Sequence, residues 1–176
     1  VCLAVLKFAS LGLSRANYGY THFRSESTYG DPEDALFLTS AGPEFEKHYF
    51  HNNFFLRSPL FRWSMANEGA CTWAWVKEAA RTGKLTADEE WAVRQNMALG
   101  VTSGITISFP GTSAREKGVL GLMADPGLDD AAVEDIYSKH INVLMAVANV
   151  MHLKLTKLPV SRRRLLTRRQ REALEW

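Results

Sequence analysis

The sequence holds only two cysteines, Cys2 and Cys71. Two cysteines supply neither a disulfide framework nor the ligand spacing of a zinc site, so a reducing cytoplasm is the expected location. The sequence also lacks any run of about eighteen apolar residues, the length that a membrane-spanning helix needs. We therefore expect no membrane partner.

Catalytic signatures are missing as well. The sequence has no GxSxG elbow, no HExxH pair and no Walker A loop. The stretch GVTSG, with Gly100 and Gly104, leads from an expected helix into an expected strand, which is the wrong order for a dinucleotide fingerprint. The five histidines are scattered along the chain. We predict that the protein is not an enzyme and holds neither a metal ion nor another cofactor.

Charge is distributed unevenly along the chain. The formal net charge is +2, yet residues 157–176 hold seven basic and two acidic side chains, which leaves the rest mildly acidic. The acidic body is not expected to hold nucleic acid by itself. The basic end is interpreted either as a phosphate-contacting segment or as a hydrated linker.

Hydrophobic periodicity and turn residues predict an alternation of helices and short strands. Thr86 with Glu89 forms a capping box before one of the helices. Residues 72–76 are consistent with a short strand or with an early helix start. Helices are predicted at 1–11, 43–51, 59–66, 86–99 and 128–158, strands at 17–23, 35–39, 101–109 and 119–123, and loops at 25–34 and 52–57. This order favours an α+β protein, an α/β/α sandwich with a largely antiparallel sheet and PAS-like or GAF-like layering.

Aromatic side chains are dense between residues 45 and 75. Part of this set is expected to be ordinary core, but the density also predicts a deep apolar pocket for a small amphiphilic ligand. Tyr49 and Trp73 are the best candidates to supply both a wall and a hydrogen bond. The set is Phe45, Tyr49, Phe50, Phe54, Phe55, Phe61, Trp63, Trp73 and Trp75.

The last residues predict the start of a second domain. Thr167 and Gln170 are spaced as a capping box, and an apolar face begins after them. The pattern LTRRQREALEW at 166–176 resembles the opening of the helix-turn-helix domain of LuxR-type transcription regulators. We therefore expect a sensor domain at 1–158, a basic linker at 159–166 and a truncated DNA-binding domain at 167–176.

The aromatic segment resembles the sensor domain of the same family. The family carries a Trp, a Tyr four residues later, an Asp-Pro and a second Trp, and here these places hold Phe45, Tyr49, Ser58-Pro59 and Trp73. The stretch SGITISFP, with Gly104, is similar to a family strand. The resemblance implies a pocket between sheet and helices that binds an N-acyl homoserine lactone. From the aromatic set, Phe61 is a further candidate lining residue.

Three positions depart from the family pattern. Phe45 has no donor for the lactone carbonyl, Ser58 is shorter than the aspartate and uncharged, and Gly121 has no hydroxyl. Losing a hydrogen bond to a charged acceptor typically costs about 1.5–3 kcal/mol. The departures favour a non-standard signal, such as an aryl or plant-derived analogue, over a usual lactone.

The resemblance also implies partners. Val143, Ala146, Val150, Leu153 and Leu155 spread apolar character round a second side of the 128–158 helix, which is interpreted as a homodimer face or as internal packing. DNA is expected to bind through a domain beyond Trp176, with Thr167, Arg168 and Arg169 contacting phosphates. The alternatives are a ligand-independent or truncated inhibitory regulator that forms inactive dimers, and a generic PAS-like or GAF-like binding module.

Overall fold

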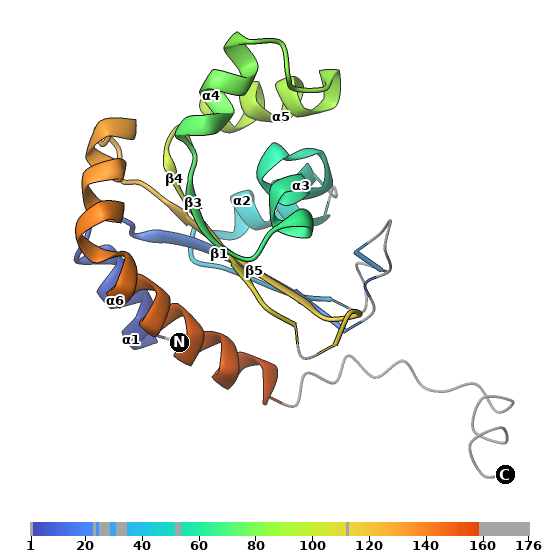
Figure 1. The fold of residues 1–176 in the computed structure, drawn as a ribbon, viewed down its shortest axis with the longest axis vertical. Helices are drawn as coiled ribbons and strands as arrows, with labels where there is room; N and C mark the ends of the chain where they lie inside the picture. Colours follow the sequence, from blue (N-terminus) through green and yellow to red (C-terminus); the bar gives the residue numbers. More distant parts are fainter. Residues whose placement is uncertain are drawn as a thin grey trace, which may run out of the picture.

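A five-stranded antiparallel sheet forms the centre of the computed structural model, which describes residues 2–22, 24, 29–30, 35–51, 54–111 and 113–158. Its strand order is β2-β1-β5-β4-β3. The strands are β1 (Arg15–Thr21), β2 (Leu36–Thr39), β3 (Gly69–Thr72), β4 (Gly104–Phe109) and β5 (Lys117–Met123). Helices lie on both faces of this sheet (Figure 1), so the predicted α+β sandwich is confirmed.

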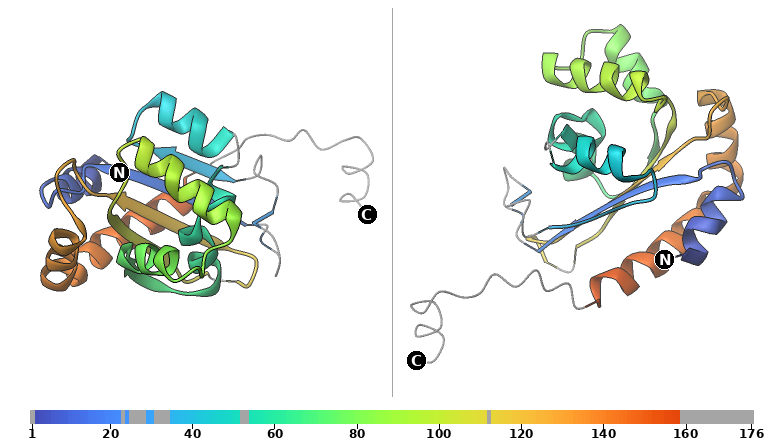
Figure 2. Two further views of the ribbon diagram at one scale, coloured as in Figure 1. Left: turned by 90° about the horizontal axis from the view of Figure 1, so that it is seen from above. Right: turned by 180° about the vertical axis from the view of Figure 1, so that it is seen from behind.

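The two faces of the sheet are covered by different sets of helices. Helices α1 (Cys2–Ala9) and α6 (Asp130–Thr156) pack together over one face, and the shorter helices gather over the other (Figure 2). The shorter elements are α2 (Pro43–Glu46), the π-helix η2 (Lys47–His51), the 3-10 helix η3 (Phe54–Arg57), α3 (Pro59–Ala66), α4 (Ala74–Arg81) and α5 (Ala87–Ala98).

The alternation of side chains along the strands sorts them between the two layers. In β4, Ile105 and Ile107 are fully buried against the α1–α6 layer, and Thr106 between them faces the shorter helices. In β5, Leu120 and Leu122 join the same core, whereas the intervening Gly121 faces the other way. One face of the sheet therefore carries the main hydrophobic core, and the other combines small and polar residues with a few apolar ones, Phe37, Val119 and Met123.

Local capping fixes the helices around that second face. The predicted capping box of α5 is confirmed, because the Thr86 hydroxyl accepts from the Glu89 N–H and the Glu89 carboxylate accepts from the Thr86 N–H. Ser58 caps α3, with Pro59 at the first helical position. Both helices therefore begin at residues that their caps fix.

Several predicted boundaries were wrong. The strand expected at 101–109 begins only at Gly104, because the Val101 N–H bonds back to the Asn96 carbonyl and closes α5. Residues 72–76 divide between β3, which ends at Thr72, and α4, which starts at Ala74. Phe54–Arg57, expected as loop, forms η3. Most of the loop at 25–34, the linker at 159–166 and the segment at 167–176 lie outside the described residues.

Helix α6 keeps a partly apolar outer side. Leu155, which we assigned to that side, is instead buried in the core at 1% exposure. Val143, Val150 and Leu153 are 44%, 61% and 57% exposed, and Ala146 between them is exposed too. On the neighbouring α1, Leu3 and Leu6 are also exposed. In the part of the chain that the structure describes, no helix combines the length and apolarity needed to cross a membrane.

Candidate ligand-binding site

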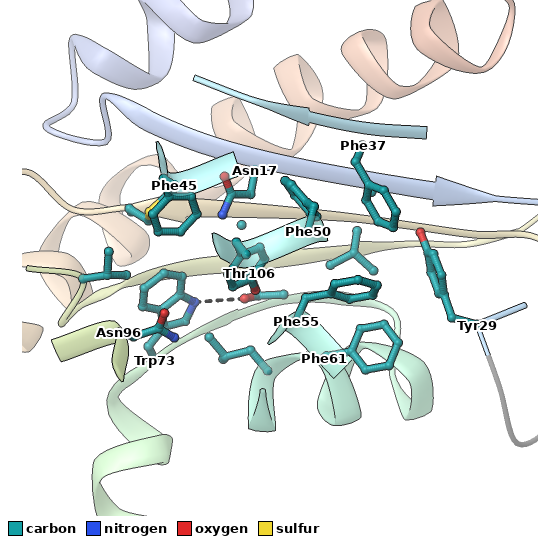
Figure 3. A pocket seen from close by; sticks show the side chains of 17 residues that line it. Asn17, Tyr29, Phe37, Phe45, Phe50, Phe55, Phe61, Trp73, Asn96 and Thr106 are labelled. Atoms are coloured by element: carbon teal, nitrogen blue, oxygen red, sulfur yellow. Dashed lines mark hydrogen bonds between the residues drawn. The ribbon is translucent and has the colours of Figure 1, made fainter. Parts of the chain in front are cut away.

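A cavity lies between the polar face of the sheet and the shorter helices (Figure 3). It encloses about 670 Å³ of empty space, including the part that opens to solvent. Aromatic residues dominate its lining, and none of the lining residues carries a charge. They are Asn17, Gly19, Tyr29, Phe37, Phe45, Tyr49, Phe50, Phe55, Leu60, Phe61, Trp73, Asn96, Val101, Thr106, Val119, Gly121 and Met123.

Gly121 lies between two polar side chains on the floor of this cavity. In the sheet register, Asn17 of β1 and Thr106 of β4 both pair with Gly121 of β5. A Cβ added at Gly121 would meet nothing closer than the Asn17 carbonyl oxygen, at 3.9 Å. The missing side chain at Gly121 therefore leaves open space between Asn17 and Thr106.

The aromatic wall is contributed by segments that are distant in the sequence. Phe37 of β2 stacks on Phe50 of η2, with 4.6 Å between ring centroids, and Phe45 of α2 stacks on Tyr49 at 5.2 Å. Phe55 and Phe61 meet edge to face at 5.4 Å. These contacts are worth roughly 0.5–1.5 kcal/mol each beyond the area that they bury, so they hold the wall in a defined shape.

Trp73 forms part of the cavity wall, but its indole N–H is not free to bind a ligand. Its indole N–H donates to the Thr106 hydroxyl oxygen over 2.9 Å (Figure 3). An indole has a single donor, which is therefore occupied. The Thr106 hydroxyl keeps its own hydrogen for another acceptor, so the donor expected from Trp73 is available at Thr106 instead.

A hydrogen bond joins the side chains of Tyr49 and Ser58. Burial raises the pKa of Tyr49 to about 12, an effect that its hydrogen bond with Ser58 partly offsets. The Ser58 hydroxyl also accepts the Leu60 N–H at 3.3 Å as the cap of α3. Ser58 is 2% exposed and does not line the cavity. Its role in this structure is to position Tyr49 and α3.

Among the residues that the structure describes, two buried polar atoms of the lining have no hydrogen-bond partner, the Tyr29 hydroxyl and the Asn96 side-chain oxygen. They lie at opposite ends of the cavity in Figure 3. Buried polar groups are normally paired, so both atoms are suited to a molecule inside the cavity. Within the described ranges, no group of three metal-ligating side chains occurs.

The structure brings together five of the six ligand-contacting residues predicted from the sequence. Phe45, Tyr49, Phe61, Trp73 and Gly121 line the cavity, and only Ser58 does not. The predicted DNA contacts at 167–169, which are Thr167, Arg168 and Arg169, lie outside the described residues.

Sequence reasoning missed four polar lining residues, Asn17, Tyr29, Thr106 and Asn96. The sequence pattern could have predicted Thr106, because it is a hydroxyl residue within a strand whose neighbouring residues are apolar. Tyr29 stood in a polar stretch that predicted only a loop, and Asn96 stood near the end of an ordinary helix. Nothing local in the sequence marked these two.

The chain resembles known sensor domains in sequence pattern and in fold. Residues 4–155 match the family model described as the autoinducer binding domain. The N-acylhomoserine-lactone-dependent LuxR-family factor CepR2 of Burkholderia cenocepacia superposes with a TM-score of 0.62 at 17% identity, over 87% of this chain and 81% of that one.

Two further solved structures share the fold. SdiA of Escherichia coli superposes with a TM-score of 0.60 at 15% identity, over 97% of this chain and 67% of that one. The VqsR ligand-binding domain of Pseudomonas aeruginosa gives 0.55 at 12% identity, over 86% and 84%. No curated protein matches the sequence significantly.

Proposed function

This chain belongs to the autoinducer-binding domains of LuxR-type transcription regulators, and from that premise we propose that its cavity senses a small, uncharged, amphiphilic signal. The signal is an acyl homoserine lactone or an aryl or plant-derived analogue of one. Its binding controls dimerisation and DNA binding of a cytoplasmic regulator.

The observation that carries this proposal is the uncharged aromatic cavity with unpaired polar atoms in its lining. An apolar space with a few convergent polar groups is the usual form of a small-molecule site. Leaving a buried polar atom unpaired costs about 1–3 kcal/mol. A bound molecule that pairs with the Tyr29 hydroxyl and the Asn96 oxygen removes that cost.

The chemistry at the Trp73 end suits an amide. A ligand N–H donates to the Asn96 side-chain oxygen, and a ligand carbonyl accepts from the Thr106 hydroxyl. The flat indole of Trp73 forms the wall beside both groups. Phe45 and Tyr49 close this end with apolar surface. This arrangement replaces the indole donor and the carboxylate that Phe45 and Ser58 do not provide.

A thermal-melt series tests the proposal. The protein is melted alone and with an excess of acyl homoserine lactones of varied chain length and of aryl analogues. A ligand present at about a hundred times its Kd stabilises the fold by about 2.7 kcal/mol, which raises Tm by about 5–10 °C for a domain of this size. A stable fold that no lactone and no aryl analogue shifts contradicts the proposal and favours the ligand-independent alternative.

The proposed dimer uses the outer side of α6. Val143, Val150 and Leu153 form one exposed apolar stripe at helical spacing, next to exposed leucines of α1. Grouped apolar exposure of this kind is typical of interaction surfaces. A second copy of the chain covers the stripe and sets the spacing of two DNA-binding domains.

Charged substitutions on this stripe are expected to separate the dimer. The double variant Val150→Glu, Leu153→Glu places like charges in the apolar contact, so light scattering at tens of micromolar should report a monomer where the unmodified chain is a dimer. Lys84→Glu, on the exposed turn between α4 and α5, is the control and should stay dimeric. A dimer that persists in the double variant rules out this face.

A further inference from the structure

The Tyr29 side chain lies at the end of the cavity opposite Asn96 (Figure 3) and is 4% exposed. Its hydroxyl is buried and has no hydrogen-bond partner within the described part of the chain. Burial raises the pKa of Tyr29 well above its ordinary value. The phenol therefore stays neutral, and it can both donate and accept a hydrogen bond.

Neighbouring rings hold this phenol in place. Tyr29 meets Phe61 edge to face with 5.5 Å between ring centroids, meets Phe55 in the same way at 6.0 Å and stacks on Phe37 at 6.2 Å. The hydroxyl lies over Gly19, where an added Cβ would stand 3.2 Å from the oxygen. The buried hydroxyl therefore lies against the sheet at Gly19, another residue of the cavity lining.

Packing does not explain the hydroxyl. A phenylalanine at position 29 would make the same ring contacts with Phe37, Phe55 and Phe61 and would leave no buried polar atom unpaired. Unpaired buried polar groups are rare in folded proteins, because such a group loses its hydrogen bonds to water and gains none from the protein. The oxygen is therefore suited to a partner that arrives with the ligand.

We propose that the signal ends in an aromatic ring that carries a hydroxyl group, and that this group hydrogen-bonds to Tyr29 at the end of the cavity opposite Asn96. The inference rests on the proposed function and narrows its ligand class. Ring-lined walls at several orientations accommodate a flat ring through both stacked and edge contacts. The ring hydroxyl supplies the acceptor and donor that the Tyr29 hydroxyl lacks.

Two probes that differ by one hydroxyl test the inference. They are N-(4-hydroxycinnamoyl)-homoserine lactone and N-cinnamoyl-homoserine lactone, titrated calorimetrically into the full chain. The unmodified protein is expected to bind the hydroxylated probe about tenfold more tightly, equivalent to about 1.4 kcal/mol. Tyr29→Phe, which keeps the ring, is expected to remove that difference while it retains affinity for the cinnamoyl probe.

Tyr137→Phe is the matched control. The Tyr137 hydroxyl donates to the Ala70 carbonyl at 3.1 Å and does not line the cavity, so its loss should leave the tenfold ratio intact. Equal affinities for the two probes in the unmodified chain, or a ratio that survives Tyr29→Phe, overturn the inference but leave the proposed function standing. Failure of a folded chain to bind either probe or any lactone overturns both.

Discussion

Replacing Gly104 with alanine is expected to destabilise the fold by about 3 kcal/mol, the upper end of what overpacking typically costs. An added Cβ overlaps the Leu122 carbonyl oxygen and stands 2.9 Å from the Trp73 ring. The first of these neighbours is sheet backbone and cannot rotate away. Relief therefore requires β4 and β5 to separate, which breaks the central pairing of the sheet.

Thermal melting measures the effect against a matched glycine. A loss of about 3 kcal/mol lowers Tm by roughly 6–12 °C in a domain of this size. Gly121→Ala is the control, because its Cβ meets nothing closer than 3.9 Å and alanine is no less favourable than glycine within a strand. Its Tm should stay close to that of the unmodified protein. Equal Tm values for the two variants would contradict the steric argument.

Replacing Glu89 with glutamine is expected to cost about 2 kcal/mol at neutral pH, within the range for hydrogen bonds to charged groups. Glu89 is 5% exposed. Its carboxylate accepts from Arg62 Nε at 2.5 Å, from Arg62 Nη2 at 3.2 Å and from the Thr86 N–H at 2.9 Å. The pair joins α3 to α5, and these helices carry Phe61 and Asn96 into the cavity lining.

The pH dependence of this loss has a definite sign. Burial by itself would raise the pKa of Glu89, but the hydrogen bonds from Arg62 and Thr86 outweigh it and lower the pKa below its ordinary value of 4.5. A carboxyl with a depressed folded pKa stabilises the fold above its unfolded pKa. That contribution disappears as the pH falls through the folded pKa.

Urea unfolding at pH 7 and at successively lower pH checks this prediction. The difference in unfolding free energy between the unmodified chain and Glu89→Gln should be largest at pH 7 and shrink below about pH 4.5. Glu78→Gln is the control, since Glu78 and its partner Arg81 are 59% and 73% exposed and exposed ion pairs contribute little. A Glu89→Gln difference that is the same at every pH would contradict the ionic origin.

The sequence alone determined the sandwich class, the α5 capping box and most of the aromatic wall, because these features depend on local patterns. Capping needs residues three positions apart, and strand alternation needs every second residue. The same local reasoning placed Phe45, Tyr49, Phe61 and Trp73 in one site, and the family resemblance added Gly121.

Tertiary structure alone decided which polar atoms face the ligand. The indole N–H of Trp73 donates to Thr106, a partner 33 residues away in the sequence. The Ser58 hydroxyl lies outside the cavity lining and caps α3. Tyr29 and Asn96 become unpaired lining groups only because segments that are distant in the sequence meet around one cavity. Such hydrogen-bond choices depend on neighbours that are distant in the chain, and no local pattern in the sequence records them.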